Sequence, residues 1–123
     1  MVSKEEIFHF QQKFTLEERQ SKFKEIESYL DKCVPIIIEE SRTSSEDSPA
    51  KYNLFLMSKD TTFTLMSKKI KERNIVNPEK AIFFLLNGKI AVSLSTTLSS
   101  VYEQYKHEDG FLYVLYSFEN VWG

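Results

Sequence analysis

Cysteine and histidine are the side chains of this sequence that could most directly act as a nucleophile, a general base or a metal ligand. The chain has one cysteine, Cys33, and two histidines, His9 and His107. A reactive thiol needs an activating neighbour, and no histidine or asparagine lies near Cys33 in the sequence. Two histidines so far apart do not suggest a set of metal ligands. We therefore expect an inert Cys33, solvated histidines, no catalytic residue, no metal site and no cofactor.

The other polar residues give no catalytic or nucleotide-binding pattern. The carboxylates recur as on solvated helix faces, and the sequence has neither a glycine-rich phosphate loop nor a serine, histidine and aspartate arrangement. An enzyme is therefore the least supported class. A basic cluster could contact partner enzymes or anionic headgroups, although a charged outer helix face is the commoner meaning of such a run. Its members are Lys68, Lys69, Lys71 and Arg73.

Length and composition exclude several further classes of protein. A chain of 123 residues, 41% hydrophobic and 28% charged, can build one hydrophobic core, so we expect one globular domain. Its net charge of −2 creates no global field that favours nucleic acid.

A lone cysteine and no leader segment favour a reducing, cytoplasmic location. No apolar run approaches the ~20 residues that span a bilayer, so membrane association would need an added anchor or a surface contact.

Two capping-box patterns predict two N-terminal helices. Ser3 with Glu6 and Thr15 with Glu18 have the spacing in which each residue caps the other's backbone N–H. Apolar residues at helical spacing follow each pattern. They are Ile7, Phe10 and Phe14 in the first helix, and Leu16, Phe23, Ile26 and Leu30 in the second. We expect both helices to pack on the rest of the chain, because these aromatic residues have no other apolar surface to meet.

The middle of the chain predicts a hairpin followed by a helix. Residues 34–38 are β-branched and apolar, which is typical of a strand, and Pro35 should lie at a strand start or an unpaired edge position. Residues 39–50 are polar and indicate a connection, after which residues 52–57 resume strand character. Thr61 or Thr62 can then cap a helix whose apolar face contains Phe63, Met66 and Ile70.

The last part of the chain predicts a second hairpin, a helix and a final strand. Residues 81–86 form a buried strand, Asn87-Gly88 is a strong two-residue hairpin signal, and residues 90–92 are the partner strand. Asn77-Pro78 separates this hairpin from the preceding helix. A helix with its apolar face at 98, 101, 102 and 105 follows, then a turn at residues 107–110 and an aromatic strand at residues 111–117.

This order of elements predicts an α+β fold, a ubiquitin-like β-grasp with two additional N-terminal helices. We divide the chain into an N-terminal helical extension (residues 1–30), a β-grasp core (residues 31–117) and a flexible C-terminal tail (residues 118–123).

Five segments together resemble the autophagy-related protein 8 family of ubiquitin-like modifiers, of the GABA-receptor-associated protein type. Each segment alone is weak, but their order and spacing are specific, and the likeness covers nearly the whole chain. The segments are residues 34–39 (VPIIIE), 81–87 (AIFFLLN), 98–103 (LSSVYE), 108–114 (EDGFLYV) and the ending Trp122-Gly123.

The resemblance implies a non-enzymatic modifier of the autophagy pathway. E1-like and E2-like enzymes would activate Gly123 and join it to phosphatidylethanolamine, and a cysteine protease would process or delipidate the chain. The lipid would hold an otherwise cytoplasmic protein on the autophagosome membrane. We leave two alternatives open, an unconjugated β-grasp adaptor and a modifier attached to protein lysines.

The resemblance also implies a groove for cargo receptors and adaptors with the motif aromatic, any, any, aliphatic, which add a strand to the sheet edge. The aromatic pocket would be lined by Ile26, Pro35, Ile37, Leu56 and Phe111, with Lys22 and Leu54 at its rim. The aliphatic pocket would use Phe55, Met57, Met66 and Ile70, with Arg73 near the acidic side of the peptide. The family usually has a basic residue at Cys33, more lysines at residues 51–54 and a proline at Ser58, so we expect acidic flanks of the motif to add little here.

Overall fold

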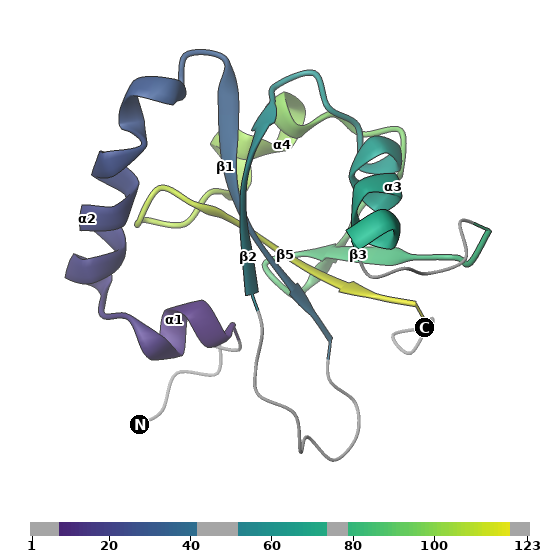
Figure 1. Ribbon diagram of the computed structural model, residues 1–123, viewed down its shortest axis with the longest axis horizontal. Coiled ribbons are helices and arrows are strands. Elements are labelled where there is room, and N and C mark those ends of the chain that lie inside the picture. Colours follow the sequence, from purple (N-terminus) through teal and green to yellow (C-terminus); the bar gives the residue numbers. More distant parts are fainter. Residues whose placement is uncertain (1–7, 42–51, 74–78, 119–123) are drawn as a thin grey trace.

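A computed structural model of the chain describes residues 8–41, 52–73 and 79–118. Its elements occur in the order that the sequence predicts, with one 3₁₀ helix, η1, added (Figure 1). They are α1 (His9–Lys13), α2 (Leu16–Glu25), η1 (Glu27–Tyr29), β1 (Cys33–Glu40), β2 (Tyr52–Ser58), α3 (Phe63–Arg73), β3 (Phe83–Leu86), β4 (Ile90–Ala91), α4 (Leu98–Tyr105) and β5 (Leu112–Ser117). The pattern Ser3–Glu6, Ile7, most of the connection after β1 and Asn77-Pro78 lie outside the described residues.

The strands form one mixed sheet in the order β2-β1-β5-β3-β4. β1 pairs with β5 in parallel, and the other neighbouring strands are antiparallel. Figure 1 shows α1 and α2 on one side of β1 and β2, and α3 on the other side. This architecture confirms the predicted β-grasp with two additional N-terminal helices.

Alternate side chains of β1 enter two different cores. Val34, Ile36 and Ile38 pack with α3 and α4, whereas Ile37 packs with Phe8, Phe10, Phe111 and Tyr113. Successive side chains of a strand point to opposite faces, so one strand serves both layers. The N-terminal helices therefore pack on the sheet, as the aromatic residues at their apolar positions predict. Pro35 lies just before the ladder with β5, which begins at Ile36.

Local signals in the sequence fix several element boundaries. Thr15 Oγ1 accepts the Glu18 N–H at 3.1 Å, and Glu18 Oε1 accepts the Thr15 N–H at 2.8 Å, which completes the predicted capping box. Of the two threonines proposed to cap α3, Thr62 receives the Leu65 N–H on its hydroxyl, at 3.2 Å. Asn87 and Gly88 have φ values of 54° and 72°, as a two-residue hairpin with the twist of its strands requires.

Glu39 corrects the predicted start of the connection after β1. The strand continues to Glu40, and Glu39 is a buried residue with 2% of its surface exposed. Its Oε1 accepts the His9 N–H at 2.9 Å, and its Oε2 accepts the Phe10 N–H at 3.0 Å. The first N–H groups of a helix have no partner within it, and Phe8 supplies no side-chain cap to α1, so the Glu39 carboxylate takes that role. Burial raises the pKa of Glu39, although both backbone N–H groups oppose that shift.

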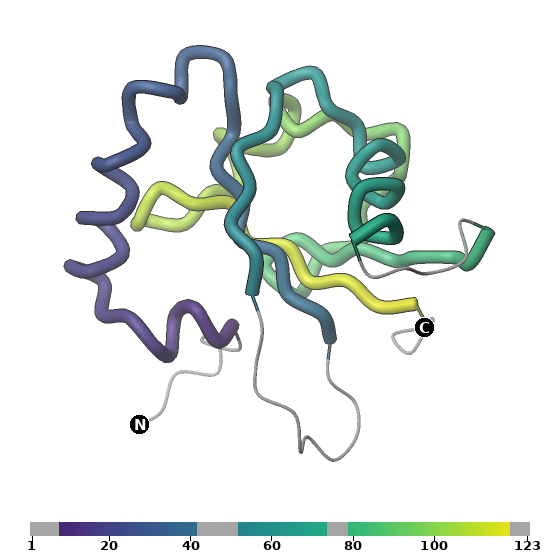
Figure 2. Tube along the Cα trace, in the orientation of Figure 1, coloured from purple at the N-terminus to yellow at the C-terminus, as the bar shows by residue number. Residues whose placement is uncertain are grey.

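A second buried carboxylate, Asp109, attaches α2 to the start of β5. Asp109 Oδ2 lies 2.8 Å from Arg19 Nη1 and accepts the Tyr113 hydroxyl at 2.5 Å, while Oδ1 accepts the Phe111 N–H at 2.9 Å. Figure 2 shows the turn before β5 reaching toward α2. The predicted solvation of His107 is wrong, because its ring packs on Tyr113 and its Nδ1 lies 3.5 Å from Asp109 Oδ2.

Hydrogen bonds decide the charge state of the Asp109 carboxyl group. Burial alone would raise the pKa of Asp109, but the hydrogen bonds from His107, Tyr113 and Phe111 outweigh burial and lower this pKa below its ordinary value. Burial and the bond to Asp109 raise the pKa of Tyr113. At neutral pH an ionised Asp109 therefore faces a cationic Arg19 and a neutral Tyr113.

Replacement of Asp109 by asparagine should destabilise the fold. Asp109→Asn leaves the buried Arg19 guanidinium without its carboxylate, which costs about 3–5 kcal/mol of unfolding free energy. Urea denaturation measures the change. Asp60→Asn, at an exposed aspartate, is the matched control, and a free energy for Asp109→Asn equal to that of this control would contradict the role of the pair.

The same variant should also change the pH dependence of stability. The pKa of Asp109 is lower in the folded chain, so its contribution is present above its ordinary pKa and is lost as pH falls through its folded-state pKa. Between about pH 7 and about pH 3, Asp109→Asn should therefore lose less unfolding free energy than the unsubstituted chain.

Candidate functional site

The outer edge of β2 is the place where the fold can accept another strand. In the described part of the chain β2 pairs with β1 alone and forms one end of the sheet. Such an edge presents backbone N–H and C=O groups that an extended peptide can pair with. Leu54 and Leu56 lie opposite Ile37 and Pro35 in the ladder, on the face that α1 and α2 cover.

The intervening residues of β2 point to the opposite face. Phe55 and Met57 lie opposite Ile36 and Val34 and pack with the core beneath α3. The predicted aromatic and aliphatic pockets thus fall on opposite faces of the same edge strand. This division follows from the alternation of side chains along β2 and from the way in which β1 serves both cores.

The structure brings the predicted aromatic-pocket residues to one face and gives them different depths. Ile37 and Phe111 are completely buried, and Ile26 packs against the same aromatic cluster. Leu54 and Leu56 are 42% and 39% exposed and form the open wall. The residues predicted for the floor of this pocket are therefore part of the hydrophobic core.

Further aromatic residues, which sequence reasoning assigned only to packing or to no site, border this cluster. Phe14, Phe23 and Tyr52 are partly buried against it, and the Phe23 and Phe111 ring centroids are 5.7 Å apart. Gly110, at φ 100°, allows the close approach of Phe23, because a Cβ on Gly110 would lie 2.4 Å from Phe23 Cδ1. The only indication of their role in the sequence was the helical spacing that places Phe14 and Phe23 on the apolar faces of the N-terminal helices.

The predicted aliphatic-pocket residues lie deeper than a surface pocket. Met66 and Ile70 are 0% and 3% exposed, inside the core beneath α3, and Phe55 is partly buried beside them. A surface pocket of about 450 Å³ opens next to them, and two predicted residues line it, Met57 of the aliphatic set and Leu56, which was predicted for the aromatic pocket. The lining residues for which sequence reasoning predicted no peptide contact are Ser58, Thr61, Leu65, Lys68, Lys69 and Glu72. Among them Leu65 is an apolar side chain of α3 that is 55% exposed, and such an exposed apolar residue is the clearest indication of a binding surface.

Basic side chains border both faces of the β2 edge. Lys22 Nζ lies 4.4 Å from the centre of the Phe14 ring, and the Arg73 guanidinium lies 4.9 Å from the centre of the Phe55 ring. Lys68 and Lys69 line the pocket beside α3, with Glu72 as the acidic member. Cys33 is half-buried at the start of β1, opposite Ser58. The rim therefore carries positive charge even with a thiol at position 33.

Other parts of the predicted site lie beyond what the structure describes. Gly123 and all but the first residue of the predicted tail are outside the described residues. Within the described ranges, none of the helices combines the length and the apolar composition that crossing a bilayer requires.

Comparison with known proteins identifies the family. The model of the family described as "Autophagy protein Atg8 ubiquitin like" matches residues 18–123. Autophagy-related protein 8d of Arabidopsis thaliana is 35% identical over 119 residues, covering 95% of this chain and 96% of the plant protein. Autophagy-related protein 8 of Saccharomyces cerevisiae is 32% identical, covering 93% of this chain and 96% of the yeast protein.

A human relative extends the comparison to the animal branch. Microtubule-associated protein 1 light chain 3 gamma of Homo sapiens is 29% identical over 114 residues, covering 93% of this chain and 78% of the human protein. The family match covers most of the chain, residues 18–123. The chain belongs to the Atg8 family of ubiquitin-like autophagy proteins.

Proposed function

We propose that this chain is a modifier conjugated through Gly123 to phosphatidylethanolamine, and that its β2 edge recruits partners with the motif aromatic, any, any, aliphatic. One observation carries the recruitment function: the free edge of β2 has one apolar surface on each face of the sheet. The family supports a ubiquitin-like role in autophagy, and the groove gives that role a physical means of choosing partners.

The motif spacing follows from the alternation of side chains along a strand. Two residues three positions apart point to opposite faces of an added strand, because the side-chain period of a strand is two. An aromatic side chain can then lie beside Leu54 and Leu56 while the aliphatic one lies near Met57, on the α3 face. Two residues that are two positions apart would both point to one face.

The residues proposed to bind the peptide share three roles. Some form a buried floor that shapes the pockets, some form walls, and some carry rim charges that face solvent. The buried floor comprises Pro35, Ile37, Met57, Met66, Ile70 and Phe111; the walls comprise the exposed Leu54 and Leu56 and the partly buried Ile26 and Phe55; the rim comprises Lys22 and Arg73.

The membrane part of the proposal rests on the chemistry of a terminal glycine. Glycine has no Cβ, so its backbone can enter the narrow clefts of E1-like and E2-like enzymes and of a cysteine protease. A diacyl lipid brings two acyl chains, and at ~0.8 kcal/mol per buried CH₂ two chains suffice for stable anchoring. The proposed sites of action are the cytoplasm and the autophagosome membrane, with residues 118–123 as the conjugation tail, residues 31–117 as the β-grasp core and residues 1–30 as the helical extension.

Changes to the exposed wall should weaken peptide binding without unfolding the protein. Leu56→Ala should weaken binding of a Trp-Ser-Ser-Leu peptide by about 1 kcal/mol or more, if Leu56 lines a desolvated contact. Ile90→Ala is a matched control, because Ile90 is also 39% exposed and lies on β4 at the other end of the sheet. A Trp-Ser-Leu peptide should bind more weakly than the longer one. Calorimetric affinities equal for both peptides would contradict the two-face groove.

Deletion of Gly123 should abolish conjugation and leave peptide affinity intact. The chain is incubated with E1-like and E2-like autophagy enzymes, ATP and phosphatidylethanolamine vesicles, and the product is weighed by mass spectrometry. One lipid added to a vesicle-bound protein supports the proposal. A ladder of protein adducts would support the modifier of protein lysines, and an unmodified chain that still recruits the peptide would support the unconjugated adaptor.

A further inference from the structure

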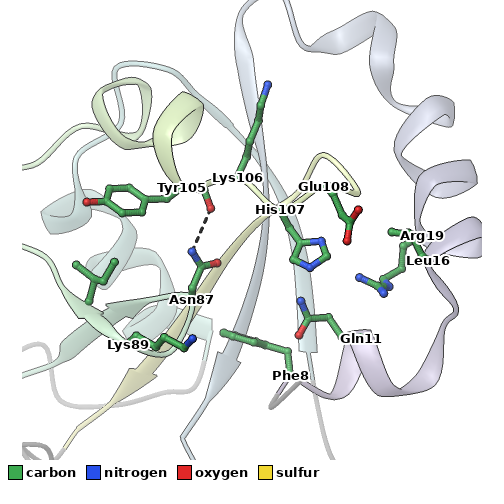
Figure 3. Close-up of a pocket in the computed structure, with 11 residues that line it drawn as sticks. Phe8, Gln11, Leu16, Arg19, Asn87, Lys89, Tyr105, Lys106, His107 and Glu108 are labelled. Carbon is green, nitrogen blue, oxygen red and sulfur yellow. Dashed lines mark hydrogen bonds between the residues drawn. The ribbon is translucent and has the colours of Figure 1, made fainter. Parts of the chain in front are cut away.

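A second cavity lies between the N-terminal helices and the β3–β4 hairpin (Figure 3). Its volume is about 570 Å³, which is within the usual range of small-molecule sites. One wall comes from Gln11 of α1 and Arg19 of α2, and the opposite wall comes from Asn87 and Lys89 of the hairpin. β4 ends the sheet on the side opposite to β2, so this cavity is separate from the proposed groove.

Gln11 carries a buried side-chain oxygen that lacks a hydrogen-bond partner among the described residues. The residue is 7% exposed, and the atom is its amide oxygen, Oε1. An unpaired buried acceptor costs stability, so its presence here needs a reason. In Figure 3 the amide lies at the cavity, between Phe8 and His107, and the broad terminal torsion of a glutamine lets its oxygen turn toward a bound group. The oxygen therefore favours a ligand that donates a hydrogen bond.

Asn87 presents a second amide oxygen to the cavity. Its Nδ2 donates to the Tyr105 carbonyl oxygen at 3.2 Å, and this bond fixes the orientation of the amide. The oxygen then points the other way, toward the side on which Gln11 lies (Figure 3). Amide oxygens accept hydrogen bonds and do not donate them. Two such oxygens on facing walls favour a ligand with an N–H₂ group, which has two hydrogens to donate.

The charges around the cavity are balanced. Arg19 Nη1 lies 2.8 Å from Asp109 Oδ2, and Lys106 Nζ lies 3.1 Å from Glu103 Oε1. Lys89 also has an interaction within the protein, so no anionic ligand is needed to neutralise it. The basic side chains of the lining are matched in number by the acidic side chains of the lining and its ion pairs, with Arg19, Lys89 and Lys106 against Glu103, Glu108 and Asp109. A charged ligand would upset this balance, whereas a neutral ligand keeps it.

The rest of the lining favours an apolar body attached to a carboxamide. Phe8, Leu16 and Ile90 lie around the cavity and can cover a small hydrocarbon group. The Gln11 amide has a donor, Nε2, beside its acceptor, and a carboxamide has the complementary pair. A carboxamide is also neutral, and its nitrogen carries the N–H groups that the two amide oxygens need.

We propose that this cavity is a binding site for a small neutral carboxamide with an apolar body. The N–H₂ group of the ligand donates to Gln11 Oε1 and Asn87 Oδ1, its carbonyl oxygen accepts from Gln11 Nε2, and its hydrocarbon part packs on Phe8 and Ile90. Because the ligand contacts both the helices and the hairpin, it binds the folded chain alone and stabilises the packing of the N-terminal helices on the core. The site is independent of the proposed function, since it uses neither the β2 edge nor Gly123.

Four compounds that share a cyclohexane ring separate the features of this ligand. Cyclohexanecarboxamide is the probe, methyl cyclohexanecarboxylate lacks the N–H group, cyclohexanecarboxylate is an anion, and cyclohexylmethylamine is a cation. Each is titrated into the full ¹⁵N-labelled chain. The carboxamide should cause saturable shifts of the Gln11 and Asn87 side-chain amide signals. The other three compounds should bind about tenfold more weakly or less, equivalent to about 1.4 kcal/mol.

The same titrations contain the results that would overturn the proposal. One is the absence of a saturable shift with the carboxamide, which would leave the cavity to water. Another is equal affinity for the carboxamide and the methyl ester, which would show that the N–H group is not recognised. Tighter binding of the carboxylate or of the amine would assign the cavity to a charged ligand instead.

The variant Gln11→Met assigns the hydrogen bond. It keeps the length of the side chain and removes the amide, so the carboxamide should lose its advantage over the methyl ester. The melting temperature of the ligand-free variant should equal or exceed that of the unsubstituted chain, because the unpaired oxygen is gone. Gln20→Met, at an exposed glutamine of α2, should keep the advantage. A preference for the carboxamide that survives in Gln11→Met would overturn the proposal.

Thermal melting of the unsubstituted chain gives a readout that needs no variant. A ligand that binds only the folded state raises the melting temperature as its concentration exceeds its Kd. Cyclohexanecarboxamide at about ten times the Kd from the titration should therefore raise it, and the methyl ester at the same concentration should raise it less. An unchanged melting temperature with the carboxamide would contradict a site that joins the helices to the hairpin.

Discussion

Burial of β1 on both faces is the constraint on which the rest of the structure depends. The side chains from Val34 to Glu39 are all buried, with alternate members in the core under α3 and in the aromatic core under α1 and α2. A strand buried on both faces has a near-continuous apolar sequence, and the segment VPIII is one. Because β1 serves both cores, it joins the packing of the N-terminal helices to that of the β-grasp core.

Two buried carboxylates hold these helices in place. Glu39, on β1, accepts hydrogen bonds from the first backbone N–H groups of α1. Asp109 holds α2 through its ion pair with Arg19. Since Phe111 follows the Asp109 turn and its ring packs with Phe10 and Phe23, the same turn also positions a residue proposed for the floor of the aromatic pocket. The position of α2 and the shape of the candidate groove are therefore coupled.

The parts of the fold that follow from local sequence were predictable, and those that depend on distant partners were not. The Thr15–Glu18 box, the apolar face of α3 and the Asn87-Gly88 turn each involve a few neighbouring residues. Glu39 and Asp109 looked like ordinary polar residues because the groups that they bind on the N-terminal helices are 29 to 90 positions away in the sequence.

For the candidate groove, too, the sequence predicted the local pattern but not the contacts between distant elements. Helical spacing placed Met66 and Ile70 on the inner face of α3, and the open pocket instead uses the flank that carries Leu65 and Lys69. Periodicity identifies the face of a helix that is buried, but it cannot show where a neighbouring strand stops covering that face. The pairing of β2 with β1 gives this information, because it determines which side chains of β2 lie at the edge of the sheet.

Hydrogen exchange of the β2 backbone tests the central claim most directly. A peptide that adds a strand pairs with the outward N–H groups of Tyr52–Ser58, and these alternate along the strand. With the Trp-Ser-Ser-Leu peptide bound, alternate β2 amides should exchange more slowly, while the amides of Ile90–Ala91 at the opposite end of the sheet keep their rates. Unchanged exchange along β2 under saturating peptide, or protection at β4 instead, would contradict strand addition at this edge.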